Sequence, residues 1–233
     1  MLKFFKFLIG LVLLPSAVAL ALVFARQLQH GAGLGTPETT TLWFLGGFAA
    51  WLVLFAMFPR PIRTYVLGHE LTHALWGMLM GAKVSRLRVS ARGGSVTLDK
   101  SNVWITLAPY FFPFYSALAL IAYLLIGLFW DTSAYLPFWY ALFGLTWSFH
   151  LSFTVLILMT RQPDIQEHGR IFSYALILCI NLLTASALLN LLTSQAWPDL
   201  GVAVLTELKG TYKFCGTQAA ILFDKLPPIS INP

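Results

Sequence analysis

The sequence predicts an all-α polytopic membrane protein with about six transmembrane helices and one small β-hairpin. The first observation is composition: of 233 residues, 58% are hydrophobic and 10% are charged, whereas a soluble domain carries about 25% charged residues. The second is that the apolar residues form runs long enough to cross a bilayer, which needs about 20 residues. The third is a short alternating segment with a Gly-Gly pair, which is typical of a hairpin.

Six apolar runs define the expected spans, and polar or proline-containing connections separate them. In chain order they are residues 1–25, 41–58, 62–80, 103–130, 136–159 and 171–192. The first run begins with Lys3 and Lys6, and its length favours a helix that stays in the protein. Removal as a signal peptide after Ala17-Val18-Ala19 is the alternative.

Prolines and a glycine mark several span boundaries. Pro59-Arg60-Pro61 ends the second span, because proline lacks a backbone donor and biases the preceding residue away from helix. Gly81 can cap the third span. Pro109 and Pro113 predict a bent or broken start to the fourth. Asp131-Thr132-Ser133 predicts a very short turn before the fifth.

Residues 84–98 have the period of a β-hairpin. Leu87 and Val89 alternate with Arg86 and Arg88, and Gly93-Gly94 is expected to form the turn. A two-stranded hairpin is marginal alone in water, so it must pack on the membrane domain. A basic surface loop is the alternative. In the tail, residues 200–208 and 217–223 are too short to span and are expected to form interfacial or packed helices.

The net charge of +6 is spread over loops and tails. We interpret it as charge at the membrane flanks, with the lipid bilayer as partner and no nucleic acid. Cys179 and Cys215 are the two cysteines, and their separation is not a metal-ligand spacing.

The chemistry-bearing motif is His69-Glu70-Leu71-Thr72-His73, inside the third apolar run. Histidines four residues apart share one face of a helix, so both imidazoles can reach one metal ion. A glutamate beside the first histidine is placed to act as a general base on water. This is the H-E-x-x-H arrangement of zinc hydrolases.

A buried histidine pair with a nearby salt bridge is the alternative to a metal site. The chain has only five histidines and four glutamates, so the spacing of His69, Glu70 and His73 would rarely arise by chance. Each ionisable residue at mid-membrane costs about 2.5 to 3.5 kcal/mol and usually marks a functional site. A bound cation would offset that cost, which favours the metal site.

A catalytic zinc site takes three protein ligands and leaves one position open, so a third ligand must come from elsewhere. The polar connection after the fifth span offers three candidates: Asp164, Glu167 and His168. Two spans separate the hairpin from this connection, which returns it to the side of the membrane nearer His73. Asp131 would lie on the opposite side, and connectivity therefore favours Asp164. An ordinary solvated connection is the alternative for this segment.

Two further residues are weaker candidates for the third ligand. Asp99 lies in the hairpin segment, and His150 lies inside the fifth span. A single intramembrane histidine is more often a hydrogen-bonded core residue than a ligand.

With these residues in place, the chain resembles the site-2 protease family of intramembrane zinc metalloproteases. The resemblance covers about residues 62–192 and is carried by the membrane-embedded Gly68–Ala74 stretch and the basic Gly-Gly hairpin that follows. The proline-containing span start and the aspartate after a later span add to it. It implies zinc bound by His69, His73 and Asp164, with Glu70 catalytic. The family aspartate usually precedes a glycine, whereas Ile165 follows here; Glu167 and His168 therefore stay as alternative ligands or supporting residues.

The resemblance implies a zinc metalloendopeptidase that hydrolyses peptide bonds of membrane-protein or peptide substrates within or near the bilayer, in a bacterial inner (plasma) membrane. The expected organisation is two N-terminal transmembrane helices (1–60), a metalloprotease-like core (61–193, with the hairpin at 83–100) and a C-terminal tail (194–233). A zinc protease that uses Glu167 as third ligand is one alternative. A non-catalytic metal-binding scaffold or regulator is the other.

Overall fold

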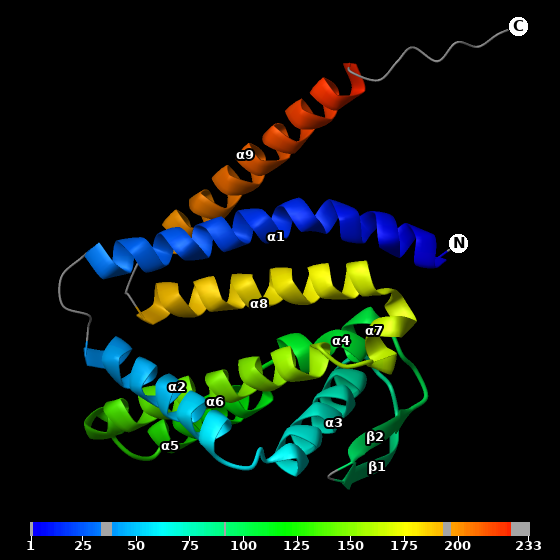
Figure 1. The fold of residues 1–233 in the computed structure, drawn as a ribbon. Coiled ribbons are helices and arrows are strands. Elements are labelled where there is room, and N and C mark those ends of the chain that lie inside the picture. The colour runs from blue at the N-terminus through cyan, green and yellow to red at the C-terminus, as the bar shows by residue number, and fades with distance from the viewer. Residues whose placement is uncertain (1, 34–38, 91, 193–196, 225–233) are drawn as a thin grey trace, which may run out of the picture.

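The computed structural model describes residues 2–33, 39–90, 92–192 and 197–224. Within them the chain is mostly helical with one small antiparallel hairpin, as the sequence predicts (Figure 1). In chain order the elements are α1 (Leu2–Gly33), α2 (Thr39–Met57), α3 (Ile62–Leu79), β1 (Val84–Ser90), β2 (Gly93–Leu98), α4 (Val103–Phe111), α5 (Phe114–Gly127), η1 (Ser133–Tyr135), α6 (Leu136–Leu158), α7 (Pro163–His168), α8 (Arg170–Leu192) and α9 (Trp197–Asp224).

Four helices in the described ranges are long and apolar enough to cross a membrane: α1, α2, α6 with its short lead-in, and α8. The α4–α5 pair would make a fifth, but its two halves meet at 77°. The motif helix α3 is not among the candidates, because its arginine, glutamate and two histidines lower its mean hydropathy. A membrane protein is therefore supported, and the expected six spans become four or five in this part of the chain.

The predicted break in the fourth apolar run is confirmed. Asn102 caps the start of helix α4, because its side chain accepts hydrogen bonds from the backbone N–H groups of Trp104 and Ile105. The helix ends at Phe111, and the backbone is extended at Phe112. Pro113 then precedes α5 and cannot donate to the turn before it. The break brings the end of α4 and the start of α5 close to α3.

The hairpin is also confirmed, but the chain reverses before the Gly-Gly pair and not at it. The register pairs Ser90 with Gly93 and Val89 with Gly94, so the two glycines begin β2 and do not form the turn. Both strands lie against α3. A Cβ on Gly94 would lie 2.7 Å from side-chain atoms of both Val66 and Glu70, so glycine allows β2 to cross closely over the motif helix.

The two ends of the chain differ from expectation. Helix α1 continues to Gly33, through a stretch expected to start a polar loop. The tail forms one continuous helix, α9, where two short segments were expected. Helix α9 packs on α1 (Figure 1): the Tyr212 hydroxyl donates to the Val12 carbonyl at 2.6 Å, and Glu207 pairs with Arg26.

Glycines allow two helix pairs to approach at backbone distance. A Cβ on Gly47 of α2 would collide with the backbone of Ala141 in α6, and one on Gly144 with the backbone of Phe44. On the other side of the molecule, a Cβ on Gly10 of α1 would lie 2.7 Å from the Cα of Phe172 in α8. Small residues allow this close contact between apolar helices. In lipid no hydrophobic driving force brings helices together, so van der Waals packing at such contacts stabilises the pair.

Candidate metal centre

Helix α3 places the two motif histidines one turn apart, as the sequence predicts. Their Nε2 atoms lie 3.2 Å from each other. Both side chains are largely buried, with 12% and 11% of the surface of His69 and His73 exposed. Both imidazoles therefore direct their Nε2 atoms toward the same point.

The other nitrogen of each ring is held by the protein. The Nδ1 atom of His73 lies 2.8 Å from the carbonyl oxygen of Ile105 in α4 and donates to it. The Nδ1 atom of His69 lies 3.1 Å from the hydroxyl of Tyr65, one turn earlier on α3. When Nδ1 carries the proton, the Nε2 lone pair is free. Contacts of this kind fix the tautomer and the ring orientation of metal-binding histidines.

Asp164 arrives from 91 residues further along the chain, on the short helix α7. Its Oδ2 atom lies 3.6 Å from the Nε2 atom of His73 and 3.6 Å from that of His69. Ile165, the next residue, is 2% exposed and packs in the core with Leu107. The buried Ile165 side chain thus fixes α7 and turns Asp164 toward α3.

Hydrogen bonds stabilise the charged form of Asp164. Burial of the carboxyl group raises its pKa, but interactions with His69 and His73 and a hydrogen bond from Tyr110 outweigh burial. The pKa is held below its ordinary value as a result. The Tyr110 hydroxyl donates to Oδ2 at 2.8 Å. The carboxylate is therefore ionised and oriented, as a metal ligand must be.

The three donor atoms fit a tetrahedral zinc ion. Zinc bonds to nitrogen or oxygen are about 2.0 to 2.2 Å long, so neighbouring donors of a tetrahedral site lie about 3.3 to 3.6 Å apart. The observed separations are 3.2, 3.6 and 3.6 Å. Among the described residues, the cluster of His, Cys, Asp or Glu side chains able to hold a metal ion is His69, His73 and Asp164.

Glu70 is buried beside this cluster, on the side of α3 that faces the hairpin. It is 7% exposed and lies near the backbone of Val96 in β2. Its Cγ atom is in contact range of Gly94. Glu70 also interacts electrostatically with His73 and Asp164. The hairpin therefore covers the glutamate without displacing it from the cluster.

The alternative ligands from the same connection do not join the cluster in the described part of the chain. His168 is buried, but its Nδ1 atom accepts a hydrogen bond from Lys6 Nζ at 2.7 Å. Its Nε2 atom lies 3.8 Å from Glu167, which is half exposed. Burial lowers the pKa of His168, and the charge of Lys6 lowers it further. His168 is thus held neutral and links α7 to α1.

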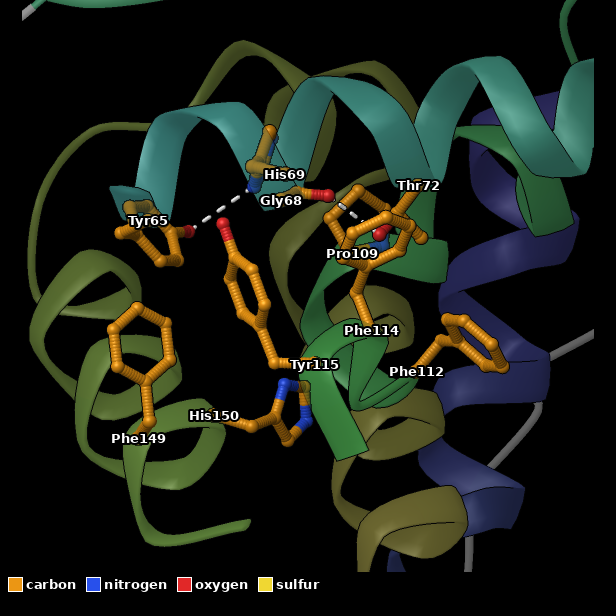
Figure 2. Close-up of a pocket in the computed structure, with 10 residues that line it drawn as sticks. All are labelled: Tyr65, Gly68, His69, Thr72, Pro109, Phe112, Phe114, Tyr115, Phe149 and His150. Atoms are coloured by element: carbon orange, nitrogen blue, oxygen red, sulfur yellow. Dashed lines mark hydrogen bonds between the residues drawn. The ribbon is translucent and has the colours of Figure 1, made fainter. Parts of the chain in front are cut away.

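The weaker candidates have other partners. Asp99 accepts from the backbone N–H of Lys83 at the open end of the hairpin. Asp131 accepts from Ser133 in the short connection before α6. His150 belongs to a separate pocket that adjoins His69 (Figure 2).

Sequence reasoning missed the residues that orient the ligands. Tyr65 precedes His69 by one helical turn, so helical spacing could have identified it. Tyr110 lies next to Pro109, and Lys6 is 162 residues from His168. Nothing local in the sequence signals those two contacts.

Comparison with protein-family models, with curated proteins and with solved structures found no match for this chain.

Proposed function

We propose that this chain is a zinc metalloprotease of the site-2 protease type that cleaves membrane-protein substrates within or near the bilayer. The observation that carries the proposal is the convergence of His69, His73 and Asp164 at tetrahedral spacing, with Glu70 buried beside them. The apolar helices around the cluster support a location in a membrane. The proposal includes a location of the protein in a bacterial inner membrane.

The donor set determines which residues would hold the ion. Two imidazole nitrogens and one carboxylate oxygen are a common ligand set of catalytic zinc, and they leave the fourth position open. A zinc ion held there would polarise a peptide carbonyl and make water more acidic. The Ile105 carbonyl, which can only accept, would keep His73 in the correct tautomer, and Tyr65 would orient the ring of His69.

Glu70 is the residue that would move protons. As general base it would take a proton from the attacking water, and as general acid it would return that proton to the leaving amine. Its burial under β2 favours this role, because a dry site strengthens the interaction of a carboxylate with a nearby proton donor.

The hairpin is the element best placed to hold substrate. A peptide bond inside a helix is shielded, so a transmembrane substrate must become extended before attack. An edge of a two-stranded sheet can pair with an extended peptide through backbone hydrogen bonds. Because β2 crosses directly over Glu70, a peptide added to this sheet would pass close to the cluster.

Metal analysis with a cleavage assay tests the proposal. Purified protein in detergent should contain about one zinc ion per chain. It should cut a transmembrane reporter peptide, lose that activity with 1,10-phenanthroline, and regain it when zinc is added. The matched variants are His73→Asn, expected to lose both zinc and cleavage, and His168→Gln, expected to keep zinc. Zinc without cleavage would favour a non-catalytic regulator, and absence of zinc would contradict the proposal.

The link between α1 and α7 yields a second prediction. Lys6→Met should lower zinc affinity by about threefold to tenfold, because His168 loses its donor and α7 loses an anchor. The expected loss of zinc affinity is no larger than the loss caused by removing a residue that hydrogen-bonds directly to a metal ligand. Lys3→Met is the control, since Lys3 precedes Lys6 by about one helical turn and is exposed. Competition with a zinc-binding dye measures both; equal affinities for the two variants would show that α1 does not support Asp164.

A further inference from the structure

The hairpin presents different chemistry on its two faces. In an antiparallel pair, residues directly opposite each other project to the same face. Val89 is opposite Gly94, and a Cβ on Gly94 would lie 2.7 Å from side-chain atoms of Val66 and Glu70. This face therefore covers the motif helix, beside which the hairpin lies (Figure 1). The residues of the opposite face point away from α3.

The outward face carries two arginines and two small hydroxyl side chains. Arg86 is opposite Thr97, and Arg88 is opposite Ser95. Both arginines are exposed, and in the described part of the chain neither forms an ion pair. Asp99, the acidic residue of the hairpin, accepts instead from a backbone N–H at its open end. Arg86 and Arg88 thus form an arginine stripe whose charge no carboxylate of these segments neutralises.

The open edge of β2 is the place where an added peptide would lie nearest to Glu70. The sheet has two strands, so one edge of β2 is paired with β1 and the other is open. A peptide at that open edge would lie about 4.8 Å from the strand that crosses Glu70, whereas a peptide on β1 would lie about 10 Å from it. The outward side chains of a peptide on β2 would continue the layer that contains the arginine stripe.

The arginine stripe can reach such a peptide across β2. Ser95 and Thr97 are short and leave space above β2, into which the long side chains of Arg86 and Arg88 can extend. A guanidinium group binds a carboxylate through paired hydrogen bonds. Outward side chains of a strand recur every two residues, so the two arginines match two carboxylates that are two residues apart.

We propose that the arginine stripe selects substrates whose extended segment carries acidic side chains at alternate positions and pairs with the open edge of β2. The inference rests on the proposed protease function and specifies its substrate class. The regular spacing of Arg86 and Arg88 favours a peptide over anionic lipid headgroups, because headgroups move freely and require no fixed period. Basic side chains at the same substrate positions would be repelled.

Peptide binding tests the stripe without requiring cleavage. Short, capped, dye-labelled peptides of alternating threonine and valine carry two glutamates either two or three residues apart, or two glutamines two residues apart. Fluorescence anisotropy measures their binding to full-length Glu70→Gln protein in neutral detergent at low salt. Glutamates two residues apart should bind about tenfold more tightly than the glutamines, as expected for two cross-strand ion pairs. They should bind about threefold more tightly than glutamates three residues apart, because only one of those can face outward.

Charge variants identify the residues responsible for the preference. The Arg86→Gln/Arg88→Gln variant should bind all three peptides with equal affinity. The matched control is Lys209→Gln/Lys213→Gln, which removes the same charge at exposed positions of α9 and should keep the preference for glutamates two residues apart. Arg86→Glu/Arg88→Glu should instead prefer lysines at that spacing, which separates charge pairing from a change in the fold.

Equal binding of the two glutamate peptides, or a spacing preference that survives in Arg86→Gln/Arg88→Gln, would overturn the proposal. So would a finding that this variant loses only its stabilisation by added phosphatidylglycerol, because lipid headgroups would then be the ligand. Cleavage of a transmembrane reporter by the wild type is measured separately. Cleavage without a spacing preference would leave the protease proposal standing, whereas a spacing preference without cleavage would support the peptide-binding face and contradict the protease.

Discussion

Replacing Glu70 by glutamine is expected to abolish peptide cleavage while the protein retains its zinc. Glutamine has nearly the same volume but cannot take a proton from water, and general acid–base catalysis contributes about a hundredfold to ten-thousandfold to rate. The zinc content should not change, because Glu70 is outside the donor set of His69, His73 and Asp164. Cleavage of a reporter peptide and zinc per chain are measured on the same preparation.

The matched control for Glu70→Gln is Glu167→Gln, which makes the same chemical change at a half-exposed carboxylate on α7. It should leave cleavage within about twofold of the wild type, because surface substitutions of this kind have small effects. Full cleavage by Glu70→Gln would remove the glutamate from the mechanism. Loss of zinc in that variant would instead indicate a structural role at the cluster.

Replacing Asp164 by asparagine is expected to weaken zinc binding by more than about a hundredfold, beyond the effect of losing a residue that only supports a ligand. Asparagine is similar in shape and retains an oxygen that can accept from Tyr110, so α7 should stay in place. It lacks the negative charge that attracts a divalent cation. Competition with a chelator of known affinity measures the change, and the unfolding temperature reports on the fold.

Glu167→Gln decides between the two zinc-protease types. If Asp164 is the third ligand, Glu167→Gln should retain wild-type zinc affinity and Asp164→Asn should not. The opposite result would favour the type that uses a glutamate from a downstream helix. The geometry supports the first outcome, since Asp164 is 3.6 Å from both Nε2 atoms while Glu167 lies beside His168.

The sequence alone predicts those parts of the fold and the site whose physical signal is local. Histidines four apart predict a shared helix face, alternating Arg and apolar residues predict the strands, and Pro113 predicts the break between α4 and α5. Asp164 was favoured by counting spans between it and the motif. The structure does place its carboxylate with the two imidazoles, although α3 is not among the candidate spans. The inference needed only the order of the elements, and it did not depend on the total number of spans.

The features that sequence reasoning missed depend on contacts between distant residues. Lys6 meets His168 across 162 positions and Tyr110 meets Asp164 across 54, and no local pattern encodes either pair. The hairpin turn was misplaced because glycine is as useful where a strand crosses a helix closely as in a turn. At Gly94 the close approach of Glu70 and Val66 requires the glycine. Helix α9 was expected as two short segments because its length depends on packing against α1.

The tight contact between α2 and α6 determines how far the chain can be shortened. Trp51 of α2 packs on Phe153 of α6 and donates to Ser152, and Phe153 stacks on Tyr65 with ring centroids 4.7 Å apart. Tyr65 in turn holds His69. A truncated chain that began at α3 would lose the wall behind that stack, and its α6 would expose a groove shaped for a helix backbone. Helix α2 therefore belongs to the smallest fragment in which the imidazole of His69 keeps its support.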